Sequence, residues 1–155
     1  MFQPLFPIKQ THLYKMYEKS VASFWTVQEV DLEHDVPDLH KLSPGEKKML
    51  ANILSFFAAS DIIVNENIMQ NLFQNCVYPE AQQFYAFQMG MESIHTVMYN
   101  LLIERYFGSG SDLFHGIENN VHIQNKAKFC LQYMNTEVSN AQRLIAYTAV
   151  EGIFF

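Results

Sequence analysis

Four ionisable side chains lie inside the most apolar helical stretches of the sequence, and their placement limits what this chain can fold into. Each has apolar neighbours on both sides along the chain; the four are Asp61, Glu92, His95 and Glu151. A charged group in an apolar interior costs free energy unless it is paired or bound to a metal ion. We therefore expect a helical core in which these side chains find partners.

Capping and helix-breaking residues predict that four or five helices account for most of the sequence, and we find no convincing strand alternation. Ser43, Pro44 and Glu46 form a helix start signal with Ser43 as the cap. The helix that follows has no breaker until about Asn75 and is apolar almost all round, which predicts that it is buried. Two very long helices indicate a four-helix-bundle core. The other expected segments are a helix from Thr11 (its N-cap) to Trp25, a loop over 30–42, a helix from Pro79 to Phe107 that stops at Gly108, a short helix over 112–118, a helix over 121–135, and a last helix that is capped by Thr136 and runs to Phe155.

Composition excludes several classes of protein. Hydrophobic residues make up 49% and charged residues 17%, which excludes an intrinsically disordered chain. The net charge is -6 and the longest basic cluster is Lys47-Lys48, so nucleic acid is not expected as a partner. The most apolar run, 49–64, is interrupted by polar residues and is too short to span a membrane. With no secretory signal pattern and only two cysteines, Cys76 and Cys130, we expect a soluble, cytoplasmic protein.

The spacing of two candidate ligands suggests a metal site. Glu92 and His95 form a Glu-x-x-His pair on one helix face, as in di-iron carboxylate bundles, where single carboxylates from other helices complete the site. Asp61 and Glu151 fit those roles, and oxygen donors with imidazole suit iron or manganese. Tyr99 lies one turn beyond His95, where a phenol can be oxidised. One Glu-x-x-His can also arise by chance, and a lone buried histidine is more often a hydrogen-bonded core residue than a ligand.

Longer segments make a family recognisable. They resemble signatures of the class I ribonucleotide reductase small subunit, in its eukaryotic and large-DNA-virus branch, and cover 22–32, 56–67, 84–95 and 149–155. The match extends from about Phe6 to Phe155 and is weakest between Gly108 and Asn140. The resemblance implies an all-α, ferritin-like di-iron carboxylate helical bundle. Residues 1–155 would form the N-terminal portion of one such domain, incomplete at its C-terminus.

The resemblance also implies a role for each matching position. A centre of two iron ions, or of manganese, would react with oxygen and leave a tyrosyl radical on Tyr99. Trp25 would carry the radical toward the large subunit, with His95 as its link to the metal. The large subunit would then reduce ribonucleotides to deoxyribonucleotides for DNA synthesis, and the small subunit would form a homodimer. The metal ligands would be Asp61, Glu92, His95 and Glu151.

One departure from the family pattern bears on activity. The family has a second motif, Asp-Glu-x-x-His, beyond the position of Glu151, and these 155 residues contain no second Glu-x-x-His. Four of six protein ligands are therefore present, and the chain alone is expected to be inactive.

Two alternatives follow. The chain can be a truncated, non-catalytic subunit that only pairs with an intact one. It can also be another ferritin-like iron protein, but Trp25 and Tyr99 argue against that.

We also expect Ile153, Phe154 and Phe155 to lack packing partners, so that the isolated chain is poorly soluble or oligomeric.

Overall fold

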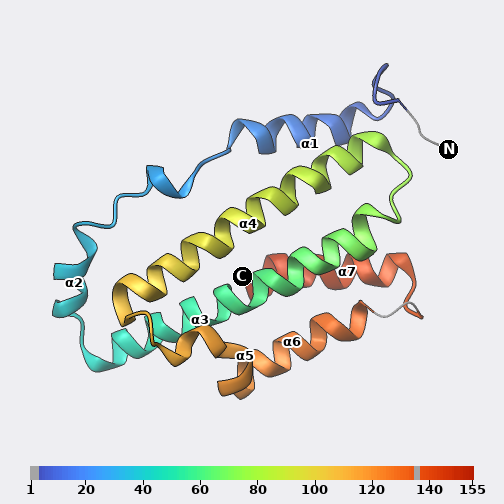
Figure 1. Ribbon diagram of the computed structural model, residues 1–155. Helices are drawn as coiled ribbons and strands as arrows, with labels where there is room; N and C mark the ends of the chain where they lie inside the picture. The colour runs from blue at the N-terminus through green and yellow to red at the C-terminus, as the bar shows by residue number, and fades with distance from the viewer. Residues whose placement is uncertain (1–3, 135–136) are drawn as a thin grey trace.

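The chain folds into an all-helical bundle around two long antiparallel helices, α3 and α4 (Figure 1). The computed structural model describes residues 4–134 and 137–155. Helix α1 lies along one side of α4, and α6 and α7 lie on the other side of α3. In chain order the elements are α1 (Thr11–Ala22), the 3₁₀ turn η1 (Val27–Glu29), α2 (Asp35–Lys41), α3 (Pro44–Asn67), the π-helical η2 (Ile68–Phe73), α4 (Pro79–Phe107), the 3₁₀ turn η3 (Asp112–His115), α5 (Gly116–Asn119), α6 (Val121–Tyr133), α7 (Asn140–Ala149) and the π-helical η4 (Val150–Phe154).

The two central helices have the boundaries that their capping residues predict. Ser43 Oγ accepts a hydrogen bond from the Glu46 amide at 3.4 Å, and Glu46 Oε2 accepts one from the Ser43 amide at 2.8 Å. This reciprocal pair satisfies two of the amides that an α-helix leaves open at its start. Helix α3 continues into η2, so the helical run ends at Phe73, close to the predicted end. Helix α4 ends at Phe107 because Gly108 takes φ +90°.

The prediction for the first helix is wrong at both ends. The N-cap is Gln10 instead of Thr11, and α1 ends at Ala22, so that Trp25 lies in the connection beyond it. At the C-terminal end the Ser23 amide bonds the carbonyl of Ser20, three residues back, and the Ser23 hydroxyl bonds that same carbonyl. This tighter pattern and the competing hydroxyl end the helix before Trp25.

The predicted loop over 30–42 is also wrong in part, because it contains α2. Pro37 falls in the first turn of α2, where a missing amide hydrogen costs no intrahelical bond. Asp35 and Asp38 in the first turn and Lys41 in the last turn complement the helix dipole.

The last helix begins later than predicted. Helix α7 starts at Asn140 after a capping box between Ser139 and Gln142, whereas the predicted cap, Thr136, lies outside the described residues. The chain then continues into η4, which carries Glu151.

The terminal aromatic residues find packing partners, which corrects the prediction that they would have none. The Phe155 ring stacks on Phe57 at 5.5 Å between centroids, and the Phe154 ring packs edge-on against Phe129 at 5.4 Å. Ile153 is 75% exposed, as predicted. Poor solubility of the isolated chain stays a prediction.

The central helix is less enclosed than the sequence suggested. The continuous helix Pro44–Phe73 is long and apolar enough to cross a membrane by length and composition, so the prediction that this region is too short is wrong. One such helix is weak evidence for a span, because core helices of soluble proteins pass the same test. Its inner face is buried, Asp61 included, whereas Ile62 and Met69 on the other face are 60% and 48% exposed.

Candidate metal centre

Helices α3 and α4 bring three of the four predicted ligands together. Asp61 on α3 and Glu92 and His95 on α4 each offer one ligand atom, and these atoms lie within 4.8 Å of one another. The i, i+3 spacing places both α4 residues on one face, and His95 Nδ1 lies 3.0 Å from Glu92 Oε2. Asp61 is 1% exposed and Glu92 8% exposed, so the group lies inside the bundle.

The fourth predicted ligand, Glu151, lies outside this compact group but next to it. It belongs to η4, is half-buried, and interacts electrostatically with Asp61, Glu92 and His95. Its Oε1 atom is buried and has no hydrogen-bond partner, and the same is true of Asp61 Oδ2. Buried carboxylate oxygens without partners are costly, and a bound cation would satisfy both.

The electrostatics of the group fit a divalent cation. Burial, with the nearby charges of Glu92 and Glu151, raises the pKa of Asp61 to about 7. Burial also raises the pKa of Glu151, and the hydrogen bond to Glu92 raises the pKa of His95. Burial and like charges disfavour the anions of the two carboxyls, whereas Glu92 stabilises the cation of His95. A bound cation would offset the repulsion between the carboxylates. A donor set of carboxylate oxygens and one imidazole suits iron or manganese.

Two aromatic side chains predicted to serve the site lie against His95. The Trp25 ring stacks on the imidazole with 5.8 Å between centroids and 26° between planes. The Tyr99 ring lies 6.3 Å from His95 and 5.0 Å from Phe57. Burial, together with Asp61 and Glu92, raises the pKa of Tyr99 to about 12, so the phenol is protonated at neutral pH.

Sequence reasoning missed two polar residues beside the ligands. Gln88 Nε2 donates to the Tyr147 hydroxyl at 2.5 Å, and the Tyr147 phenol acts on the Glu151 carboxylate, whose pKa it lowers. Gln88 lies four residues before Glu92 and Tyr147 four residues before Glu151, so each shares a helix face with a ligand. That spacing is the signal that could have found them.

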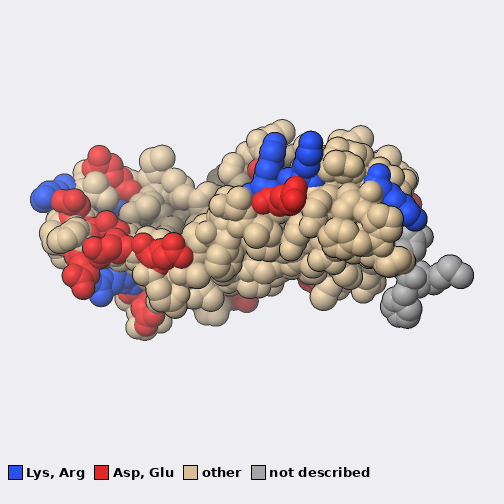
Figure 2. Space-filling view, turned by 90° about the horizontal axis from the view of Figure 1, so that it is seen from above, with Lys and Arg blue, Asp and Glu red and all other residues tan. Residues whose placement is uncertain are grey.

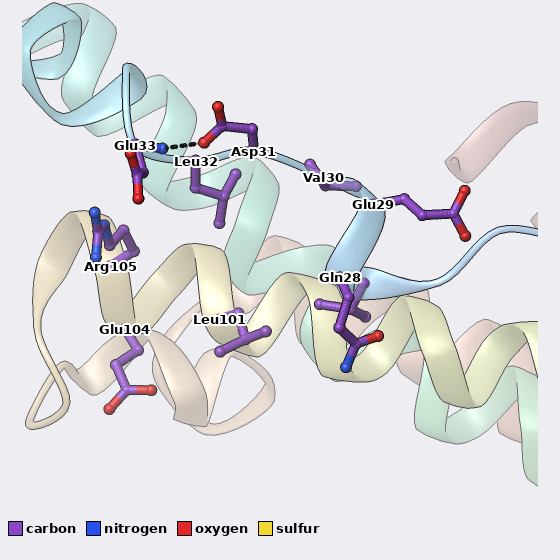
Figure 3. Close-up of a pocket in the computed structure, with 10 residues that line it drawn as sticks. Gln28, Glu29, Val30, Asp31, Leu32, Glu33, Leu101, Glu104 and Arg105 are labelled. Carbon is purple, nitrogen blue, oxygen red and sulfur yellow. Dashed lines mark hydrogen bonds between the residues drawn. The ribbon is translucent and has the colours of Figure 1, made fainter.

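A surface groove lies apart from these residues (Figure 3). It has a volume of about 830 Å³ and is lined by residues 27–33, Leu101, Glu104 and Arg105, none of which is a predicted ligand. Figure 2 shows acidic side chains gathered at the end of the molecule that carries α2. That nucleic acid is not a partner stays a prediction.

Comparisons with known proteins agree on one family. The family model "Ribonucleotide reductase, small chain" matches residues 3–155. The chain is 45% identical over 154 residues to a ribonucleoside-diphosphate reductase small chain of Arabidopsis thaliana, and the match covers 97% of this chain and 45% of that one. It is 44% identical to the small chain of Variola virus, with 97% and 48% covered.

A solved structure shows the same fold. The structure of the Saccharomyces cerevisiae Rnr4 homodimer superposes with a TM-score of 0.85 at 32% identity, covering 97% of this chain and 49% of that one. The chain thus spans about half the length of the relatives it matches.

Proposed function

Because the chain belongs to the ribonucleotide reductase small-chain family, we propose that it serves as a small subunit whose metal centre is held by Asp61, Glu92, His95 and Glu151 and whose radical site is Tyr99. The observation that carries this proposal is the meeting of three ligand side chains from α3 and α4 with two redox-capable rings, Trp25 and Tyr99, that both lie against His95.

The metal would be iron or manganese, because the donors are carboxylates and one imidazole. Two such ions with oxygen would supply the oxidant that takes one electron and the phenolic proton from Tyr99. Glu92 and His95 would hold one ion through adjacent turns of α4, and Asp61 and Glu151 would approach from α3 and η4. The remaining ligands of a two-ion centre would come from residues beyond these four.

The chain's own residues suit a protected phenol and a route outward. Tyr99 packs with Leu54, Ala58 and Ile103, and Ile103 is 0% exposed, so the ring is shielded from water on that side. Trp25 is partly exposed and stacks on His95, so the two rings connect the buried carboxylates with the protein surface. We propose that a large subunit contacts this surface and performs the reduction of ribonucleotides.

Tyr99→Phe tests the radical site. In a protein that joins this chain to the remaining ligands of the family pattern, we expect ferrous iron and oxygen to produce a tyrosyl radical that electron paramagnetic resonance detects. The Tyr99→Phe variant of that protein should show none, because phenylalanine has no phenolic proton to lose. Tyr106→Phe is the matched control, since Tyr106 is another partly buried phenol on α4 that bonds Asp35. A radical that persists in Tyr99→Phe contradicts the assignment. Iron oxidation without any radical in either protein favours an iron-storage role.

A second candidate function is pairing without catalysis. The 155 residues contain a single Glu-x-x-His and so hold four of the six ligands that the family pattern implies. This incomplete ligand set favours pairing without catalysis. A shallow groove between α3 and α4, beside the exposed Ile62, Met69 and Val97, offers an apolar face for a second small chain.

Sedimentation velocity tests this candidate. We expect the chain to form a dimer with itself or a mixed dimer with a full-length small chain, because apolar faces of this kind are buried in assemblies. Ile62→Glu should weaken that dimer, whereas Met16→Glu, on the exposed side of α1, is the control. A chain that stays monomeric in both mixtures contradicts pairing.

A further inference from the structure

Tyr147 lies between α4 and the run formed by α7 and η4, which carry different candidate ligands. It lies on α7, one turn before Glu151, and its hydroxyl meets the side chain of Gln88 on α4. Gln88 in turn lies one turn before Glu92. One phenol therefore connects the helix that carries Glu92 and His95 with the segment that carries Glu151.

The direction of the hydrogen bonds gives the phenol a defined task. The Gln88 amide nitrogen donates to the Tyr147 oxygen at 2.5 Å, so the phenolic hydrogen is available for another acceptor. The nearby acceptor is the Glu151 carboxylate, one helical turn further along, whose pKa the phenol lowers. The other carboxylate oxygen, Oε1, remains buried without a partner. The phenol is thus placed to bond the Glu151 carboxylate, which still has an oxygen available for another partner.

Glu151 needs such support because of where it lies. Its segment, η4, is π-helical and directly continues α7, which packs on α6. The other candidate ligands lie on the long helices α3 and α4, whereas Glu151 lies on the short segment η4, and a glutamate side chain has several rotamers that a partner can restrict. Partners that orient a ligating carboxylate reduce the freedom lost when the metal binds, and their removal weakens binding.

We propose that Tyr147, held by Gln88, is a positioning residue that orients Glu151 so that its free oxygen faces the group formed by Asp61, Glu92 and His95. The proposal depends on the metal-binding function proposed above, and it adds a residue that acts on the metal only through Glu151. Tyr147 needs no contact with the metal for this role.

The test is a titration of the 155-residue chain with Co²⁺, whose visible absorption reports the donor atoms. We expect Tyr147→Phe to bind Co²⁺ about 10–100-fold more weakly, the range found when partners of ligating side chains are removed. We also expect its absorption bands to shift, because Glu151 then binds in a different orientation. Gln88→Met leaves the phenol in place and should weaken binding in the same direction but less.

The matched control is Tyr106→Phe, which also removes a hydroxyl that joins two helices. Tyr106 bonds Asp35 on α2, away from the candidate ligands, so its loss should lower stability while Co²⁺ affinity and spectrum stay as in the unmodified chain. This comparison separates orientation of a ligand from general loss of stability.

The possible outcomes are distinct for the two proposals. The metal site stands if the unmodified chain binds Co²⁺ and Asp61→Asn does not. If, in addition, Tyr147→Phe matches the unmodified chain in affinity and spectrum, the role of Tyr147 is overturned. If the unmodified chain binds no Co²⁺, or Asp61→Asn binds it equally well, the proposed metal site fails and the role of Tyr147 fails with it.

Discussion

Replacing Asp61 by asparagine is expected to abolish divalent-metal binding while making the metal-free chain more stable at pH 8. The carboxylate is 1% exposed, and one of its oxygens has no hydrogen-bond partner in the described structure. Asparagine has nearly the same shape but no charge, so it removes a ligand and, at the same time, an uncompensated buried charge. Titration with Mn²⁺ measures the first effect, and urea unfolding of the chelated protein measures the second.

The stability change has a definite pH dependence. The pKa of Asp61 is about 7 in the folded chain against an ordinary value of 3.8, so between these values the folded state binds more protons than the unfolded state. Stability therefore falls as the pH rises through this window, and the loss is complete above about pH 7. The raised pKa values of His95 and Glu151 act in the same direction. Asp61→Asn removes the contribution of Asp61, so the fall between pH 5 and pH 8 should become smaller.

Asp38→Asn is the matched control for this substitution. Asp38 is exposed and pairs with Lys41 at 2.6 Å, so its loss should change stability by less than about 1 kcal/mol and leave metal binding intact. Equal metal affinity in Asp61→Asn, or a pH dependence as steep as in the unmodified chain, contradicts the assignment of Asp61.

Gly116→Ala is expected to destabilise the chain strongly, although the change adds one methyl group. A Cβ at Gly116 would lie 2.2 Å from Ser55 Oγ and 2.8 Å from the Ser55 carbonyl oxygen. The carbonyl belongs to α3 and cannot move without distorting that helix, and such overpacking costs about 1–3 kcal/mol. Ser55 Oγ would also have to leave the Leu113 carbonyl, which it bonds at 2.8 Å, at a cost of about 1 kcal/mol. Urea unfolding measures the sum.

Gly90→Ala is the control for Gly116→Ala. Gly90 lies within α4, and a Cβ there meets no other atom within 4 Å. Alanine in a helix interior is favoured over glycine by about 0.5–1 kcal/mol, so Gly90→Ala should stabilise the chain. If both substitutions change stability equally, Gly116 is not required for the close approach of α5 to α3.

Local signals were enough to predict the central helices from the sequence. The start of α3 depends on Ser43 and Glu46, which lie three residues apart, and the end of α4 depends on Gly108 alone. The grouping of Asp61 with Glu92 and His95 was also foreseeable, because buried charges in apolar helices need partners. That these residues bind metal, that Tyr99 carries a radical and that the protein is cytoplasmic stay predictions.

Features that depend on contacts between distant segments were not predictable in the same way. The start of α1 is fastened by Glu80, which accepts hydrogen bonds from the amides of Lys9 and Gln10 about 70 residues away in the chain. The terminal phenylalanines found partners on α3 and α6, whose positions no local pattern specifies. Tyr147 had a local signal, its distance of four residues from Glu151, but its bond to Gln88 follows only from the packing of the helices.

Because η2 and η4 are π-helical, the packing of this core depends on the number of residues in each segment as well as on their type. Each π turn contains one residue more than an α turn, so the side chains that follow are rotated by about 100° around the helix axis. Val150 in η4 packs with Ile68 and Leu72 in η2, so the two π-helical segments meet in one cluster. A deletion of one residue in either segment would therefore turn a whole face of the helix, a larger change than any single substitution there. Sequence comparisons across these segments need gaps of one position wherever a relative has an uninterrupted α-helix.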